Sequence, residues 1–536
     1  MSESTSGAGT LVALLVFVAA SVWLGTVAQR IVKRGSFLRG YFLGNRGLGA
    51  WALALTATVQ SGGTFMGFPS FVYSHGWSLS LWIASYMIVP ISGFAILGKR
   101  LAQLSRRTGA ITLPDLFRER FASPALGLLT LVFVLFFMCF MMVAQFKAGA
   151  IVMKVAWPGS GALALEETTG NLDYYYYLGL TIFALTVVGY TVIGGFLAAV
   201  WTDLFQSVMM LVGVMILLPL VLTAAGGLEH ASRVAAEQTS RAFLSPTGYS
   251  ADGRTFLPLG LAVSFFFVWV YAGMGSPAGM VRVMASKSSG TIRKSIFLLA
   301  VYNMLIYLPL IVICICGRAV IPELSKTDEI IPRLALHTTR HLTGGPLLAG
   351  LILTAPFGAV MATVSSFLVV IASGLVRDLY QRFLRPQASM SEIKRLTYAA
   401  MILVGAVAFV ANLRPVAYLQ ALVVFSGSGA AAGFVVPAAM ACYWRRATAQ
   451  GAFAAMASGA TTIVSLYIAG FLGDDPGIGQ ATDFRPYYLL GVDPILWGLA
   501  ASLISGITVS LLTRPPSPDL VARLFDCTPA ALGTDV

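Results

Sequence analysis

About thirteen stretches of roughly 20 mostly apolar residues run through this 536-residue chain. A helix needs about that length to cross the hydrocarbon core of a bilayer, and only a helix or a closed barrel satisfies its backbone hydrogen bonds there. We therefore predict an all-α polytopic membrane protein with about 13 transmembrane helices. The predicted spans centre near residues 10–29, 48–75, 77–98, 125–152, 174–197, 202–225, 258–281, 295–317, 345–375, 396–412, 416–443, 449–472 and 495–513.

The composition excludes the other broad classes of protein. Only 11% of the residues are charged and 57% are hydrophobic, whereas a soluble domain carries about 25% charged residues. The chain is also too apolar to be disordered. Its five cysteines fall in predicted spans or on one side of the membrane, so we expect no disulfide framework.

Lysine and arginine are distributed unequally between alternate loops. The loops after the first, third, seventh, ninth and eleventh spans, and the C-terminal tail, hold most of the 35 basic residues. Basic loops face the cytoplasm, so we predict a plasma or inner cell-membrane protein with its N-terminus outside and its C-terminus inside. The net charge of +13 is spread over many short loops. It therefore indicates orientation and does not indicate a nucleic-acid partner.

Two predicted spans are interrupted by glycine and proline. The second contains Gly62 and Gly63 followed by Pro69, and the seventh contains Gly273, Gly275 and Pro277. Such residues break helices, and secondary transporters bind ions and solutes where broken helices free their backbone groups. The two breaks lie five spans apart. Because five is odd, the second block of five would be inserted upside down, which indicates an inverted repeat and favours a transporter.

Several longer stretches resemble one known family. They are YFLGNRGLGAWALALTA, LGKRLAQLSRRTGAITLPDLF, MVAQFKAGA, YTVIGGFLAAVWTDLFQ, GRAVIPEL, TAPFGAVMATVSSFLVVIASGLVRDLY and GAAAGFVVPAAMACYWRRATAQGA. Over residues 40 to 460 the chain resembles the sodium:solute symporter family, and most of all its sodium/pantothenate symporters. The resemblance implies a LeuT-like core with a five-plus-five inverted repeat. We expect an extra helix in 1–39, the two repeats in 40–225 and 226–443, and two further helices with a cytoplasmic tail in 444–536.

The resemblance also implies two places for sodium. The main site would use backbone oxygens at Ala57, Gln60 and Ala359, with hydroxyls at 362 and 363. Thr363 supplies one hydroxyl, but Ala362 stands where relatives usually have serine. In some relatives a second sodium is bound at positions that match Asp203, Ser365 and Ser366. A helix cap at Asp203 and simple packing at the two serines are the alternatives.

The expected solute site lies between the first break and the third, fourth and seventh spans. Ser61, Thr64 and Trp269 match solute-contacting positions in relatives, and Phe267 or Tyr271 could share the aromatic role of Trp269. Further candidates are Ser85 and Tyr86 in the third span.

Lys147 is an ionisable residue within the fourth span, which makes it a functional candidate. It would either pair with a solute carboxylate or extend to the interface.

These features predict sodium-coupled symport of a small organic solute, with pantothenate or another organic acid favoured. The expected partners are the solute, sodium as the coupling ion and the lipid bilayer. No organic cofactor is expected. The alternatives are a solute receptor that does not transport, and a proton-coupled symporter of an amino acid or sugar. An enzyme is not expected, because the four histidines lack metalloprotease spacing and no catalytic triad or phosphate loop is evident.

Overall fold

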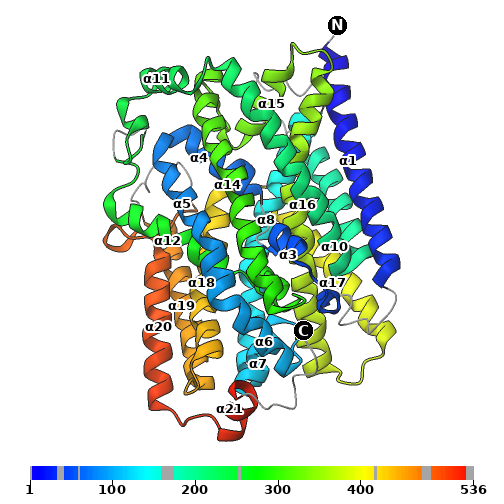
Figure 1. Ribbon diagram of the computed structural model, residues 1–536, viewed down its shortest axis with the longest axis vertical. Helices are drawn as coiled ribbons and strands as arrows, with labels where there is room; N and C mark the ends of the chain where they lie inside the picture. Colours follow the sequence, from blue (N-terminus) through cyan, green and yellow to red (C-terminus); the bar gives the residue numbers. More distant parts are fainter. Residues whose placement is uncertain are drawn as a thin grey trace.

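The computed structural model describes residues 3–32, 42–57, 61–157, 174–250, 255–415, 419–473 and 484–526. Within these ranges the chain is helical and has no β-strand, only one isolated bridge between Leu48 and Ser286. This confirms the all-α prediction (Figure 1).

The α-helices in chain order are α1 (Glu3–Val32), α3 (Ala50–Ala57), α4 (Phe68–His75), α5 (Ser80–Val89), α6 (Lys99–Thr108), α7 (Leu113–Phe121), α8 (Pro124–Ala156), α10 (Tyr174–Ala224), α11 (Leu228–Gln238), α12 (Leu259–Gly275), α13 (Pro277–Met284), α14 (Ser289–Val320), α15 (Ile330–Thr339), α16 (Gly345–Ser373), α17 (Met390–Ala411), α18 (Leu419–Tyr443), α19 (Ala449–Leu472), α20 (Pro494–Leu512) and α21 (Pro518–Phe525). The π-helices are η2 (Gly63–Gly67), η4 (Pro90–Gly98) and η7 (Gly374–Leu384), and the 3-10 turns are η1 (Gly44–Arg46), η3 (Gly76–Leu79), η5 (Arg241–Leu244), η6 (Thr327–Glu329) and η8 (Leu489–Gly491).

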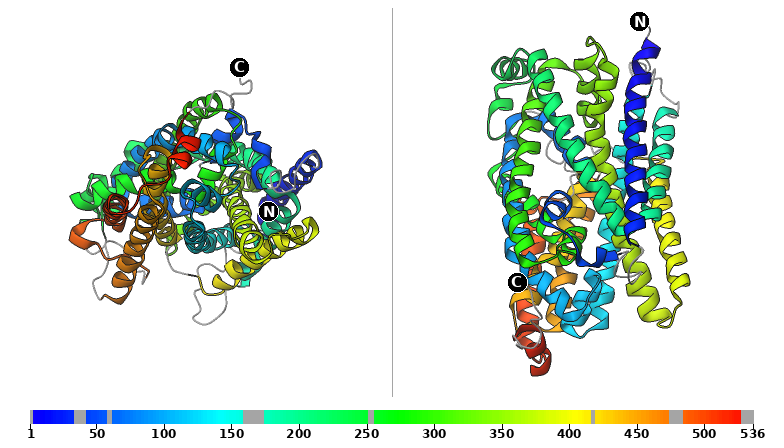
Figure 2. Two further views of the ribbon diagram at one scale, coloured as in Figure 1. Left: turned by 90° about the horizontal axis from the view of Figure 1, so that it is seen from below. Right: turned by 45° about the vertical axis from the view of Figure 1, so that its right-hand side comes forward.

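Helix α16 forms the centre of the bundle. In its most apolar window 94% of the residues are buried, against 28% for α1 and for α20. A helix that is apolar all round can be buried on every side, whereas α1 and α20 expose one face to the surroundings. Helices α8 and α10 pack directly on α16. Helix α1 lies at one edge of the bundle, and α19 with α20 lies at another (Figure 2).

Within the described residues, eleven helices are long and apolar enough to cross a membrane, or twelve when α12 and α13 are taken as one bent span. The sequence predicted about thirteen spans. The difference arises at the second and third spans, where η3 joins α4 to α5. One helical path therefore runs from Gly63 to Thr108 and passes through both spans. Helix α10 contains two predicted spans, separated at Gly195, whose φ of 63° is non-helical.

The two ends of the bundle carry different segments. Helices α11 and α15 lie at the end where α1 begins, and α6, α7 and α21 lie at the opposite end (Figure 1). The second group lies in the loop after the third predicted span and in the C-terminal tail, which the sequence analysis placed on the basic, cytoplasmic side. These segments therefore separate in space into the two groups that alternating loops require.

Candidate functional site

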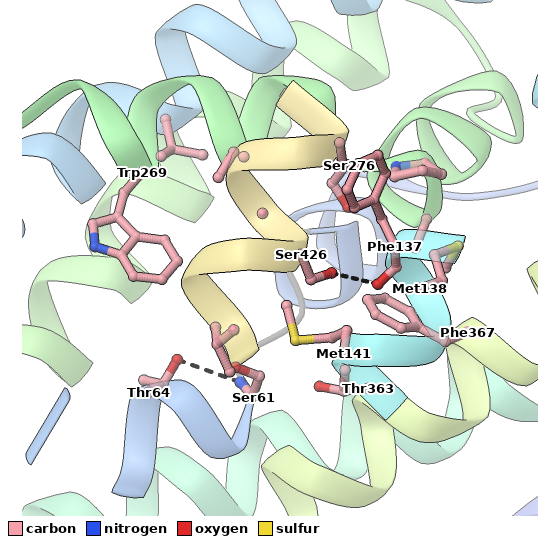
Figure 3. Close-up of a pocket in the computed structure, with 18 of the residues that line it drawn as sticks. Ser61, Thr64, Phe137, Met138, Met141, Trp269, Ser276, Thr363, Phe367 and Ser426 are labelled. Atoms are coloured by element: carbon pink, nitrogen blue, oxygen red, sulfur yellow. Dashed lines mark hydrogen bonds between the residues drawn. The ribbon is translucent and has the colours of Figure 1, made fainter. Parts of the chain in front are cut away.

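A cavity of about 120 Å³ lies in the middle of the bundle, beside both broken helices (Figure 3). A single buried water needs only ~10–15 Å³ of such space, so this cavity can hold a small organic molecule. Its lining is mainly apolar, with a few hydroxyl groups. The polar side chains in the lining are those of Ser61, Thr64, Tyr86, Trp269, Ser276, Tyr307, Thr363 and Ser426.

The first break lies between α3, whose last described residue is Ala57, and η2, and Ser61 within it is not helical. Beyond residues 58–60, the amide of Gly62 donates a hydrogen bond of 2.7 Å to Oε1 of Gln145 on α8. A side chain at Gly62 would place its Cβ 2.7 Å from the Cβ of Ala148, so α8 approaches the break too closely for any residue but glycine. The sequence prediction of a broken helix is confirmed here.

The second break lies between α12 and α13, which meet at an angle of 45°. Ser276 is extended (φ −63°, ψ 117°), and its hydroxyl accepts a hydrogen bond of 3.4 Å from the amide of Gly279. Pro277 occupies the first position of α13, where its missing N–H leaves no helix bond unmade. Ser276 therefore starts a new helix and lines the cavity at the same time.

Three aromatic rings form one wall of the cavity. The ring of Tyr86 stacks on Trp269 with a centroid distance of 5.3 Å and on Tyr307 with one of 4.1 Å. The hydroxyl of Tyr307 lies 3.1 Å from that of Thr64, so the wall is tied to the first break. Phe267 and Tyr271 stack on each other at 5.8 Å and are absent from the cavity lining. Of the three aromatic candidates on α12, Trp269 alone lines the cavity.

Among the described residues expected to bind the main sodium, Thr363 alone is in the cavity lining. The hydroxyl of Thr363 donates a hydrogen bond of 3.0 Å to the carbonyl oxygen of Ala359, four residues earlier in the same helix. Two oxygens from one turn of α16 are thus adjacent. Ala57 is the last residue of α3, and Gln60 lies outside the described residues. The carbonyl of Ala362 is engaged by the hydroxyls of Ser365 and Ser366, at 3.0 and 2.7 Å.

Asp203 lies inside α10 and is fully buried, so it is not the helix cap that the sequence allowed. The hydroxyl of Ser365 donates to its Oδ1 at 3.2 Å, and that of Ser366 to its Oδ2 at 3.3 Å. The three residues named for a second sodium are therefore in contact. Their site already contains a cation, because the guanidinium of Arg282 is bonded to Asp203 and Ser366.

Two residues named for the solute site lie elsewhere. The ammonium of Lys147 is 2.9 Å from Oδ2 of Asp328 in η6, and both side chains are buried. Its ion-pair partner in the structure is a protein carboxylate, and Lys147 is not in the cavity lining. The hydroxyl of Ser85 bonds at 2.7 Å to the carbonyl of Trp82 in its own helix and also lies outside the lining.

Sequence reasoning missed four residues that shape these sites: Gln145, Tyr307, Ser426 and Arg282. The hydroxyl of Ser426 donates to the carbonyl of Phe137 at 2.6 Å, which holds α18 against α8 at the cavity (Figure 3). Arg282 had a detectable signal. It stands in the apolar run PAGMVRVMA, where a positive charge needs a buried partner.

Comparison with known proteins adds four matches. The model of the sodium:solute symporter family matches residues 41–459. The sodium/pantothenate symporter of Haemophilus influenzae is 32% identical over 471 residues, which are 85% of this chain and 90% of that protein. The sodium/proline symporter of Escherichia coli is 27% identical over 532 residues, which are 96% of this chain and 95% of that protein. The solved structure of a sodium-coupled sialic acid symporter in a substrate-bound, outward-open state has the same fold. Its TM-score is 0.69 at 18% identity, over 95% of this chain and 98% of that one. The chain belongs to the sodium:solute symporter family.

Proposed function

We propose that this protein is a sodium-coupled symporter that carries a small organic solute across the cell membrane by alternating access. The observation that carries the proposal is the central cavity, which lies beside both helix breaks and has the Thr363 hydroxyl at its edge. Broken helices at the middle of a bundle are where secondary transporters bind solute and ion together. The protein acts as a transporter and not as an enzyme, and it uses no organic cofactor.

Pantothenate is the solute we propose first, because a relative at 32% identity is a sodium/pantothenate symporter. Its polar groups match the lining, where hydroxyls from Ser61, Thr64, Ser276 and Ser426 interrupt apolar side chains. Proline is the second solute to test, since another relative is a sodium/proline symporter.

Sodium would bind at Ala57, Gln60, Ala359 and Thr363, with Ala362 supplying no hydroxyl. The support is the place of Thr363 in the cavity lining, one turn of α16 from the Ala359 carbonyl to which its hydroxyl donates a hydrogen bond of 3.0 Å. Solute would contact Ser61, Thr64, Tyr86 and Trp269. We do not extend the solute site to Ser85 or Lys147, whose polar groups bond elsewhere.

For topology we propose an N-terminus outside and a C-terminus inside the plasma or inner membrane. Grouping of α6, α7 and α21 at one end of the bundle supports this arrangement, because these segments and their flanking loops are rich in arginine. The repeats would occupy 40–225 and 226–443, each opening with a broken helix, with the remaining helices outside the core.

The test is uptake of labelled pantothenate into proteoliposomes with and without an inward sodium gradient. Thr363→Ala removes one sodium oxygen. Since such contacts to a charged group contribute about 1.5–3 kcal/mol, half-maximal uptake should need roughly 10- to 100-fold more sodium. Thr354→Ala is the matched control, because Thr354 is buried on the same helix and bonds only to its own helix at Leu351.

Three results would change the assignment. If uptake follows a proton gradient and ignores sodium, the coupling ion is wrong. If labelled proline is accumulated and pantothenate is not, the solute is wrong. Saturable sodium-dependent binding of solute without accumulation would instead favour a receptor.

A further inference from the structure

We infer that Arg282 is the resident cation of the site formed by Asp203, Ser365 and Ser366, and that its guanidinium takes the place of a second sodium ion. The inference deepens the proposed function and rests on it: the transporter would bind one sodium per chain. Arg282 is then a positioning residue that joins the two broken helices to the centre of the bundle.

The contacts of Arg282 come from three other helices. Its guanidinium, on α13, donates to Oδ2 of Asp203 on α10, to the hydroxyl of Ser366 on α16 and to the carbonyl of Thr56 on α3. The exposed fractions of Arg282 and Asp203 are 2% and 1%, so water does not compete for these bonds.

Charge balance makes the guanidinium and a sodium ion exclusive alternatives. A buried carboxylate needs one compensating charge, and an uncompensated buried charge is strongly destabilising. Arg282 supplies that charge to Asp203. A sodium ion added beside it would leave the buried cluster with a net positive charge, and its oxygen ligands at Asp203 and Ser366 are already engaged by the guanidinium.

The position of Arg282 also ties the two broken helices together. Its guanidinium, on α13, donates a hydrogen bond to the carbonyl of Thr56 on α3. Arg282 therefore links the first half of one broken helix to the second half of the other through its own side chain, whereas a free sodium ion is not attached to α13.

The experiment counts sodium ions bound per chain on the purified full-length protein, using radioactive sodium at saturation. Wild type should bind about one ion. Arg282→Gln keeps a neutral hydrogen-bond donor but leaves Asp203 uncompensated, so sodium should enter the vacated site and the count should rise to about two. Adding Asp203→Asn to Arg282→Gln removes the charge that would attract it, and the count should return to about one.

Arg120→Gln is the matched control. Arg120 is also fully buried, but its bonds go to the carbonyls of Ala441 and Trp444 and not to a carboxylate. Removing it exposes no negative charge, so the sodium count should stay at that of wild type.

A second measurement uses only wild type and the double variant, in which both charges are removed. It can therefore be made even if Arg282→Gln alone fails to fold. At zero membrane potential, a tenfold sodium gradient can raise the inside-to-outside concentration ratio of labelled pantothenate to at most about ten when one sodium ion is coupled to each solute. With two coupled ions the limit is about a hundred. Wild type and the charge-neutral double variant should both stay at the lower limit.

Two sodium ions in wild type, with the second lost in Asp203→Asn, would overturn the inference while leaving sodium symport intact. An unchanged count of one in a folded Arg282→Gln variant would also overturn it. A wild-type chain that binds no sodium at all would instead refute the proposed function, so the two failures are distinguishable.

Discussion

The buried ion pair between Lys147 and Asp328 should be a structural clamp at the end of the bundle where α1 begins. Their charged atoms lie 2.9 Å apart, and the side chains are 9% and 8% exposed. The pair joins α8 to η6, immediately before α15. Next to it, Glu329 forms ion pairs with Lys154 at 3.5 Å and with Arg333 at 2.7 Å.

Asp328→Asn would leave the Lys147 ammonium buried without its counter-charge. Breaking a buried pair in this way costs about 3–5 kcal/mol of stability. At ~2.1 cal/mol/K of unfolding entropy per residue, 536 residues give about 1.1 kcal/mol/K, so the Tm should fall by about 3–4 °C. Replacing both partners, Lys147→Met with Asp328→Leu, removes both charges and should be neutral or stabilising by up to ~4 kcal/mol.

The assay is thermal unfolding of the purified protein in detergent, together with pantothenate uptake. Glu229→Gln is the control, because its pair with Arg233 is exposed (92% and 64%) and should change the stability by less than about 1 kcal/mol. The reasoning is refuted if Asp328→Asn leaves the Tm unchanged. It is also refuted if the double variant keeps its Tm and loses uptake, since Lys147 would then serve the solute.

Three further outcomes follow from the structure. Gly429→Ala should lower stability by about 1–3 kcal/mol and reduce uptake, because the added Cβ would overlap the Phe137 ring that lines the cavity. Gly433→Ala on the same helix is the control: its Cβ would lie 3.8 Å from the nearest atom, in Ala460, so it should be tolerated in both assays. Burial raises the pKa of Asp493 from 3.8 to about 6, so the folded state holds this proton more tightly than the unfolded state, and stability should fall as pH rises from about 4 to 6. Asp493→Asn, which can still cap the amide of Ile495, should abolish that dependence in unfolding curves measured across this pH range. Sodium should raise the affinity for pantothenate more than for its uncharged alcohol, pantothenol, in equilibrium binding; an equal effect on both would contradict a role for charge in coupling.

The helix breaks were predictable because glycine and proline mark them. Pro277 acts locally through its missing N–H, whereas at Gly62 and Gly275 another helix approaches too closely for a Cβ. The sequence therefore located the breaks without showing the contacts made at the glycines. The number of spans was also predictable. The eleven or twelve apolar helices of the described residues correspond to the thirteen predicted spans, because the 46-residue path Gly63–Thr108 contains both the second and the third. The packing of the turn between these two, η3, against η5 could not be predicted, because those residues are far apart in the sequence.

The partners of buried polar residues could not be read from the sequence for the same reason. Lys147 and Asp328 are 181 positions apart, and Arg282 and Asp203 are 79 apart. The sequence marks each as an ionisable group in or near an apolar stretch, but only the packing of the helices decides which pairs meet. Resemblance to a family placed Asp203, Ser365 and Ser366 together, yet it carried no information about the arginine that reaches them.

Because these buried charges are paired with each other, they are not free to attract a charged solute in the central cavity. The described lining of the central cavity contains no charged side chain, and Asp203 and Lys147 are each paired with an opposite charge outside it. A solute carboxylate in the cavity would therefore have the sodium at Ala359 and Thr363 as its nearest positive charge. Two opposite unit charges about 6 Å apart attract by roughly 3 kcal/mol at an effective dielectric constant of ~20. By reciprocity, sodium would raise solute affinity by about a hundredfold, and the solute would raise sodium affinity by the same factor. Coupling between ion and solute would then arise from direct charge attraction across one cavity, and a fixed cation within that lining would weaken it.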